Sequence, residues 1–321
     1  MMTWRKSARA IGMSLLATVG TAVFATAGAD SRAEWLEWVE NDREVTRKML
    51  SFATESGLHD GGQWVPELAE RHDVVSSGAR ELGFGGRLHH FRWPGGHLSA
   101  EAEVFAHDGR VVAYELTVGI EKQRAVLDAV EKVWEESGPD GVVRDRDSLT
   151  FQRRFPEAES ARRDALAAAL GVQGELDAPR KIRKKVAEQR SAFGQVVVGA
   201  LCGFAPPREP PRTVFDELED DRRVDLLAAI LRGDQPESRV LAVAHLRRLQ
   251  KNGTTLPPEL VAAMDVVLDL PLPIETCSGC IIDSQGARDA LAHYERSKGW
   301  HEVADESGER RHEKRRGMRR R

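Results

Sequence analysis

Hydrophobic side chains follow two different periods along this chain, and the change of period divides it into two parts. Residues 87–93, 99–106 and 110–118 alternate between apolar and polar positions and are rich in aromatic and β-branched side chains, the pattern of half-buried strands. Asp108-Gly109 joins the last two segments and indicates a hairpin, because both turn residues need positive φ. The pattern predicts an antiparallel sheet.

Helical patterns lie before and after these strands in the sequence. Apolar positions recur at spacings of three and four in residues 33–55 and again in residues 121–137. Residues 142–155 return to the strand pattern and predict a hairpin or a final strand. Strands followed by a helix and another strand indicate a small α+β domain.

From residue 157 onward the pattern is mainly helical. It predicts an Ala-rich helix at residues 157–170, a strongly basic one at 179–191 and an apolar one at 214–232. Another helix begins near Pro257, and a last one runs from Asp283 or Ser284 to about residue 296. Short helices with one apolar stripe each must stack, so this part predicts a helical domain.

The segment at residues 233–249 predicts one amphipathic helix within that domain. Asp234 can cap it, and Pro236 fits its first turn, where a missing N–H costs nothing. Its apolar residues fall on one face. Arg239, Arg247 and Arg248 fall on the other, so we expect them to be exposed and to be able to bind a partner.

This segment resembles the second helix of a HEAT repeat, in which an Asp–Pro start leads into an Arg and an Ala/Leu face. The residues that carry the resemblance are Asp234, Pro236, Glu237, Arg239, Ala242, Leu246 and Leu249. It covers one unit, within about residues 214–270, while a stack of repeats generally needs about three. The resemblance implies a surface for protein–protein interaction; an ordinary helical bundle is the alternative.

A Pro-rich segment separates the two parts. Residues 205–211 read APPREPP, which favours a rigid linker. The sequence thus predicts a leader at 1–29, an α+β domain at 30–205, a helical HEAT-like or bundle domain at 206–300, and a disordered basic tail at 301–321. The expected fold class is α+β, with a small antiparallel-sheet domain followed by an α-helical domain.

The first 29 residues have the three parts of a signal peptide. Arg5, Lys6 and Arg9 precede an uncharged apolar run at residues 11–24, and two small-x-small cleavage candidates end at Ala27 and Ala29. We therefore expect export to the periplasm or the outside of the cell. An uncleaved membrane anchor at residues 10–29 is the alternative. No later segment is apolar enough to span a membrane, so no transmembrane segment is expected in the mature chain.

Charge gives the chain no general attraction to nucleic acid. The net charge is −4, and loss of the leader removes three cations and no acids, leaving −7. Two segments are locally basic: the helix at 179–191 and the end of the tail at 310–321. Either could contact an anionic surface, although charged segments of this kind are usually just solvated. Specific nucleic-acid binding is not expected.

Cysteine chemistry centres on Cys277-x-x-Cys280. In an exported chain this pair predicts a disulfide. The same spacing serves thiol-disulfide oxidoreductases, and it could also supply half of a metal site. No second ligand pair lies nearby, so neither a metal nor a cofactor is expected. Cys202 lies in an apolar run and predicts a buried thiol.

Histidines gather in the predicted sheet, at His89, His90, His97 and His107. Alternation places His89 and His90 on opposite faces, so one of them could meet His97. No carboxylate at fixed spacing completes a ligand set, and solvated histidines are the commoner outcome near turns.

These observations favour an exported binding or scaffold protein over an enzyme. The predicted partner is another protein, contacted by the helical surface that carries Arg239, Arg247 and Arg248, with weak anionic contacts through the basic tail. A thiol-disulfide oxidoreductase or redox sensor built on Cys277 and Cys280 is the alternative. An exposed pair at a helix N-terminus would favour that alternative.

Overall fold

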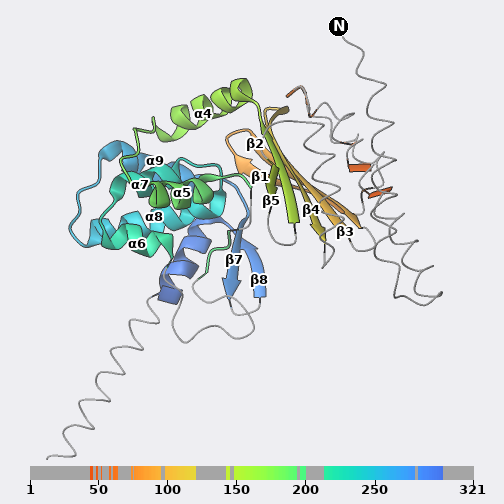
Figure 1. The fold of residues 1–321 in the computed structure, drawn as a ribbon. Helices are drawn as coiled ribbons and strands as arrows, with labels where there is room; N and C mark the ends of the chain where they lie inside the picture. Colours follow the sequence, from red (N-terminus) through yellow and green to blue (C-terminus); the bar gives the residue numbers. More distant parts are fainter. Residues whose placement is uncertain are drawn as a thin grey trace, which may run out of the picture. The chain divides into compact units, whose positions relative to one another are not determined.

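The structure of the protein is a computed structural model with α+β architecture (Figure 1). It describes residues 44–45, 48–49, 52, 58, 61–63, 74, 76–94, 98–120, 142–144, 148–193, 196–199, 213–278 and 281–298. The leader predicted at 1–29, the helix at 121–137, the linker at 205–211 and the tail at 301–321 lie outside these ranges.

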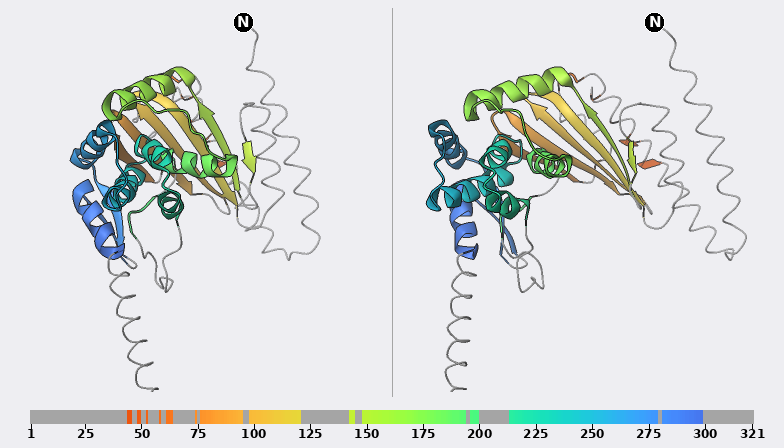
Figure 2. Two further views of the ribbon diagram at one scale, coloured as in Figure 1. Left: turned by 90° about the vertical axis from the view of Figure 1, so that its left-hand side faces the viewer. Right: turned by 60° about the vertical axis from the view of Figure 1, so that its left-hand side comes forward.

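Six strands form one twisted sheet, which Figure 2 shows from two sides. The strands are β1 (Ser76–Gly83), β2 (Gly86–Pro94), β3 (Leu98–His107), β4 (Arg110–Ile120), β5 (Val142–Arg144) and β6 (Ser148–Arg154). Their order in the sheet is β1-β2-β3-β4-β6-β5. The β3–β4, β4–β6 and β5–β6 pairs are antiparallel.

The alternation in the sequence gives the sheet two different faces. Leu116 pairs with Ala102 on one side and Phe151 on the other, and all three side chains are buried in one core. The next residue pair along, Glu115 and Gln152, faces the other way, and the two side chains are hydrogen-bonded to each other. The predicted strands and the Asp-Gly hairpin, with positive φ at both turn residues, are therefore confirmed.

Aromatic contacts build the core on the apolar face of the sheet. Phe52, a helical residue within the predicted helix at 33–55, has its ring centroid 5.1 Å from that of Phe91 and 5.2 Å from that of Trp93. Val45 and Met49 are helical and buried in the same cluster. Spacings of three and four therefore place one stripe of this helix on the sheet.

The helical part of the chain contains α4 (Pro156–Leu170), α5 (Arg180–Arg190), α6 (Val214–Asp220), α7 (Val224–Leu231), α8 (Pro236–Lys251), α9 (Pro258–Asp269) and helical residues 287–298. The helix predicted at 214–232 is two helices. Arg222 between them has φ of 52°, and such a left-handed residue cannot continue a right-handed helix. The helices predicted at 157–170, 179–191 and 233–249 and the one beginning near Pro257 are confirmed.

The helix predicted to begin at Asp283 or Ser284 is wrong in its first residues. Residues 281–285 form strand β8 (Ile281–Gln285), which pairs antiparallel with β7 (Ile274–Ser278). Helical residues begin at 287. The β-branched pair Ile281 and Ile282 favours an extended backbone, and only two residues separate β8 from β7 in the sequence.

Helix α8 is the central helix of this part, with α6, α7 and α9 packed around it (Figure 1). Every residue from Pro236 to Leu246 is buried. The sequence predicted an exposed polar face with Arg239 on it, and for Arg239 this is wrong, because its exposed fraction is 0%. The polar side chains in the first turn of this helix, Glu237, Ser238 and Arg239, are buried, and each is hydrogen-bonded to a partner within the unit.

Those partners include the tip of the β1–β2 hairpin. Gly83, Phe84 and Gly85 all have positive φ, of 77°, 53° and 74°. The turn residues Phe84 and Gly85 thus have the left-handed backbone of the tight hairpins that match strand twist. Phe84 is not glycine, so it holds this conformation only with support from its surroundings.

Arg162 of α4 supplies part of that support. Its Nη1 donates to the carbonyls of Gly83, at 3.0 Å, and Phe84, at 2.6 Å, while its Nε donates to Asp234 at 2.8 Å. The guanidinium lies close to the backbone: a Cβ placed on Gly86 would be 2.8 Å from Arg162 Nη2. A side chain at position 86 would therefore push the guanidinium from its present place.

Arg239 of α8 supplies the rest. Its Nη1 donates to the Leu82 carbonyl at 2.6 Å, its Nε donates to the Gly233 carbonyl at 2.8 Å, and its guanidinium lies 5.0 Å from the centre of the Phe84 ring. Burial lowers the pKa of Arg239 to about 9, so the group stays charged at neutral pH. We call Arg162, Arg239 and residues 82–84 the arginine clasp.

The chain forms two compact units. The sheet unit is Met1–Arg80 with Arg87–Ala161, and the helical unit is Glu81–Gly86 with Arg162–Arg321. The sequence placed the boundary near residues 205–211 instead. The difference arises because Leu166 and Leu170 of α4 and Val186 of α5 are buried in the same core as α7, α8 and α9.

Removing Arg239 from the arginine clasp should destabilise the helical unit. Arg239→Met leaves two buried carbonyls without a donor, so we expect the free energy of unfolding to fall by about 3 kcal/mol. Arg247→Met on the same helix removes a partly exposed arginine and should change it by less than about 0.5 kcal/mol. Denaturant titrations of both variants test this, and equal values for the two would contradict it.

Candidate functional site

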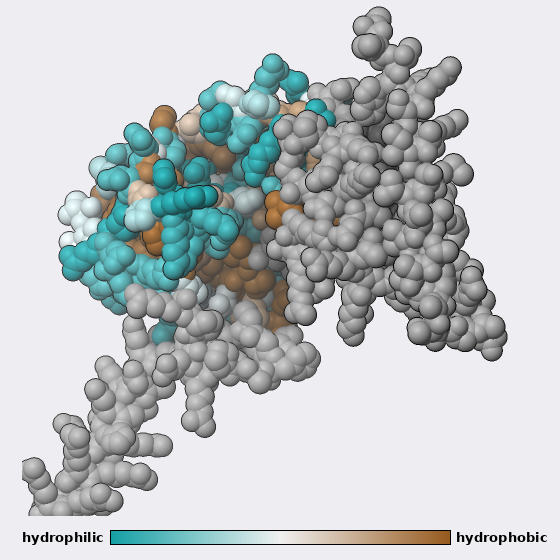
Figure 3. Space-filling model, viewed as in Figure 1, coloured by the Kyte–Doolittle hydropathy of each residue, from teal (hydrophilic) through white to brown (hydrophobic). Residues whose placement is uncertain are grey.

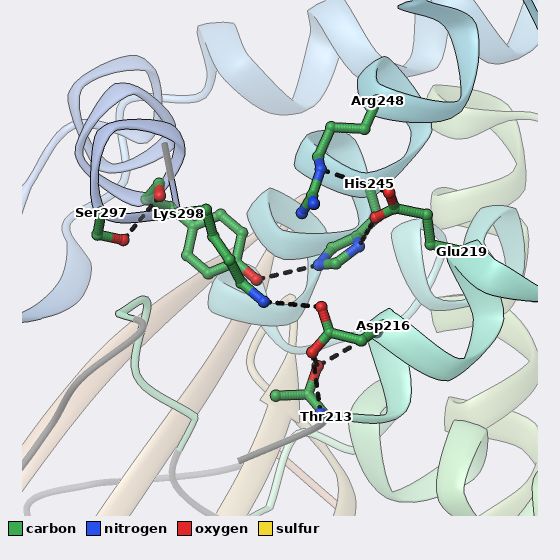
Figure 4. Close-up of polar contacts among 8 residues, drawn as sticks. Thr213, Asp216, Glu219, His245, Arg248, Ser297 and Lys298 are labelled. Atoms are coloured by element: carbon green, nitrogen blue, oxygen red, sulfur yellow. Dashed lines mark hydrogen bonds and ion pairs between the residues drawn. The ribbon is translucent and has the colours of Figure 1, made fainter. Parts of the chain in front are cut away.

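A second polar network in the helical unit draws side chains from three helices together (Figure 4). Its members are Thr213, Asp216 and Glu219 at α6, His245 and Arg248 on α8, and Tyr294, Ser297 and Lys298 in the helical residues 287–298. The sequence separations are large, so only the tertiary fold makes the network.

One half of the network is an ion pair between Asp216 and Lys298, joined at 2.7 Å. Asp216 also accepts from the backbone and hydroxyl of Thr213, while Thr213 accepts from the Asp216 amide, which makes a capping box at the start of α6. Burial raises the pKa of Asp216, but the hydrogen bonds from Lys298 and Thr213 outweigh it and lower the pKa to about 2.

The other half is a chain from a carboxylate to an imidazole and a phenol. Glu219 is hydrogen-bonded to His245 Nδ1, and His245 Nε2 lies 3.0 Å from the Tyr294 hydroxyl. Since a carboxylate only accepts, Nδ1 carries a proton, and in the neutral imidazole Nε2 accepts from the phenol. Burial and the charges of Asp216 and Glu219 raise the pKa of Tyr294, so the phenol keeps its proton.

Arg248 lies at the edge of this network. Its Nε is 3.4 Å from Glu219 Oε1, and the side chain is partly exposed. Its Nη1 is buried and has no hydrogen-bond partner in the part of the chain that the structure describes. This arginine, expected to be free for a partner, is thus already held by an acid of its own unit.

The carboxylate–imidazole–hydroxyl order is that of a general-base relay, in which the imidazole takes a proton from the hydroxyl. Here the hydroxyl is a phenol with a raised pKa, and both rings are buried, His245 completely. A substrate cannot reach either group. The network therefore holds helices together: it fixes residues 287–298 to α6 and α8.

Cys277, the first half of the candidate thiol pair, lies inside strand β7 and its side chain is buried. Cys277 N–H donates to the Val198 carbonyl at 3.0 Å, so the backbone here belongs to a sheet. Cys280 and Cys202 lie outside the described residues. The disulfide therefore stays a prediction.

The candidate histidines do not form a ligand set among the described residues. His89 is buried and its ring stacks on Phe91, whereas His90 is partly exposed and lies 3.9 Å from Glu101. His107 faces Asp108 at 3.4 Å. His97 lies outside the described ranges, and no metal-binding group of three or more such side chains occurs within them.

Strand β8 is the one strand of the helical unit whose side chains are almost all exposed. Ile281 and Ile282 are 67% and 65% exposed, which is unusual for large aliphatic side chains in a strand. Figure 3 shows hydrophobic surface in the region where Figure 1 places β7 and β8. This surface was not predicted, because residues 281–282 were read as the segment before a helix at 283–296 and not as part of a strand.

Comparisons of the chain with family models, with curated protein sequences and with solved structures found no match. The HEAT-like resemblance thus stays a prediction. Within the described residues, no helix has both the length and the apolar character needed to cross a membrane. The fold and its surfaces define the class: an α+β protein whose helical unit exposes two isoleucines on a strand.

Acid should weaken the Asp216–Lys298 pair. The folded pKa of Asp216 is about 2 and its ordinary value is 3.8, so its stabilisation is complete above pH 4 and is lost as pH falls toward 2. The two values correspond to about 2 kcal/mol of unfolding free energy. Asp216→Asn should remove that part of the pH dependence.

A matched control lies on the same C-terminal helix. Arg288 and Asp269 form an ion pair at 2.6 Å, but both side chains are mostly exposed. Arg288→Met should leave the unfolding free energy at pH 7 nearly unchanged, because solvent screens an exposed pair, whereas Lys298→Met should cost about 2 kcal/mol. Equal losses of unfolding free energy in the two variants would contradict the prediction that the buried pair contributes more than the exposed one.

The ionisation of the two tyrosines can be followed by absorbance, and it tests whether their phenols are buried. The chain contains only Tyr114 and Tyr294, and burial raises the pKa of both above 10. Stability from these groups is complete below pH 10 and is lost as pH rises through the folded values. We expect less phenolate absorbance from the folded protein at pH 10 than in denaturant, where both tyrosines are about half-ionised. A folded-state midpoint near 10 would contradict the buried phenol.

Proposed function

We propose that this is an exported binding protein whose helical unit recognises an extended segment of a partner protein through β8. The observation that supports this is the pair of exposed side chains, Ile281 and Ile282, on a strand that has one neighbouring strand among the described residues. Export is inferred from the signal-peptide pattern of the first 29 residues.

Backbone hydrogen bonds distinguish the two edges of the two-stranded β7–β8 sheet. On its outer side, β7 is bridged to Val198: the Val198 amide donates to Glu275, and the Cys277 amide donates to Val198. Strand β8 pairs only with β7 within the described chain. An added strand could therefore pair along β8, with main-chain bonds giving affinity and side-chain contacts giving selectivity.

The open edge is not equally available along its length. The Ser284 amide donates to the Asp283 carboxylate at 2.8 Å, a local bond that occupies one donor near the end of the strand. The aliphatic pair at 281 and 282 lies at the other end. A partner segment with apolar side chains would therefore contact this end, where burial of both isoleucines stabilises the complex.

The thiol-disulfide alternative has weaker support in the geometry. A reactive thiolate needs a partly exposed, electropositive setting such as a helix N-terminus. Cys277 is buried in a strand, and the next helical residue is 287. A structural disulfide that fastens the β7–β8 hairpin fits this position better than a redox centre.

Of the three arginines predicted to bind, Arg247 remains the best candidate for an additional polar contact. Arg239 is buried in the arginine clasp, and Arg248 is paired with Glu219. Arg247 is partly exposed, and no described carboxylate forms an ion pair with it. An arginine of this kind typically adds specificity at the rim of an interface.

Photocross-linking tests the binding surface directly. A cross-linking amino acid at position 281, introduced into the full chain in its native host, should yield one or a few discrete protein adducts. The same group at position 172 is the control, because Val172 is 80% exposed but lies outside any strand. We expect few adducts there.

A second substitution on the same strand tests whether the adducts depend on β8. Adding Ile282→Lys should abolish the adducts from position 281, since a charged side chain on an edge strand opposes strand addition. Equal labelling at 281 and 172, or adducts that survive Ile282→Lys, would refute the proposed surface.

A further inference from the structure

Helix α5 carries a dense set of exposed positive charges in the helical unit. Arg180, Lys181, Arg183 and Lys184 are exposed within its first two turns, while Val186 is buried and packs the helix on the core. We call these four cations the α5 basic face. It is separate from the β8 surface in sequence and in chemistry.

Most of the α5 basic face is not neutralised by the protein. Lys185, beside it, is paired with Glu217 at 2.7 Å, and Lys184 lies 3.9 Å from Glu188. Within the described residues, Arg180, Lys181 and Arg183 take part in no ion pair. Their charge is therefore available to an external anion.

Their placement does not help the helix to form. Arg180 lies three residues from Arg183 and four from Lys184, and like charges at these spacings repel each other. Positive charge in the first turn also opposes the helix dipole, and this turn has no acid and no side-chain cap. In a chain of net charge −4, such a concentration of cations lacks a structural reason.

We propose that the α5 basic face binds the surface of an anionic phospholipid bilayer. Lipid phosphates present adjacent negative charges on a flat surface, which matches cations spread over two turns of one exposed helix. No large apolar side chain of α5 is exposed, so the contact lies at the headgroups without insertion. The face has no aromatic residue on which bases could stack, which disfavours single-stranded nucleic acid.

Sedimentation with vesicles tests this in the full mature chain. Vesicles of 30% phosphatidylglycerol in phosphatidylcholine should bind the protein at 0.1 M salt, and pure phosphatidylcholine should not. Arg180→Gln, Lys181→Gln and Arg183→Gln together should weaken binding by about 100-fold, because each charge near an anionic surface contributes about fivefold. Raising the salt to about 0.5 M should release the wild type.

Two variants with the same loss of three charges provide controls. One replaces Arg163, Lys251 and Arg296, which are exposed elsewhere in the helical unit, with Gln. The other replaces Arg315, Arg316 and Arg319 in the basic tail. Both should bind the anionic vesicles at least tenfold more tightly than the α5 variant, and unchanged circular dichroism would confirm that all three variants fold.

The outcomes separate the possible sources of binding. If the tail variant loses as much binding as the α5 variant, or more, the proposal is overturned in favour of the tail. If all three variants lose binding equally, only net charge matters and the proposal fails. It also fails if the wild type ignores the anionic vesicles but binds a 20-nucleotide DNA in an α5-dependent way.

Discussion

The helical unit depends on two buried arginines, Arg162 and Arg239, whose guanidinium groups donate hydrogen bonds to backbone carbonyls. Moving a guanidinium out of water is costly unless donors in its fork meet acceptors, and Arg162 and Arg239 meet the carbonyls of residues 82–84. The same bonds stabilise a turn in which Phe84 is left-handed. The guanidinium groups need the carbonyls of this turn as acceptors, and the left-handed turn needs their hydrogen bonds. The two features therefore stabilise each other.

Other buried polar side chains of α8 are also hydrogen-bonded to residues of other segments. Its buried polar side chains have separate partners: Glu237 accepts from the Glu275 amide, Ser238 meets Gln189, and His245 lies beside Glu219. A helix with one apolar stripe could rotate or shift among similar packings. Polar groups that must be satisfied at fixed points favour one arrangement, which we regard as their role here.

The two proposed binding surfaces, β8 and the α5 basic face, differ from the rest of the helical unit because their residues do not favour its stability. Strand β8 exposes aliphatic side chains that would be more stable in a core, and α5 gathers like charges in its first turns. Both features oppose stability and have no compensating contact among the described residues, and such features are often the binding surfaces of a folded protein.

Sequence periodicity alone determined the sheet face, the Asp108-Gly109 hairpin and most helices, because these depend on neighbours two to four residues apart. The Thr213 capping box was not predicted, although Thr-x-x-Asp before an apolar run is a sequence signature of such a cap. The burial of Arg239 and the β7–β8 hairpin were decided only by the tertiary structure. An arginine on the polar face of a helix is predicted to be exposed when only its neighbours in the sequence are considered. The carbonyl that binds Arg239 belongs to residue 82, which is 157 residues away, and no local pattern predicts that contact.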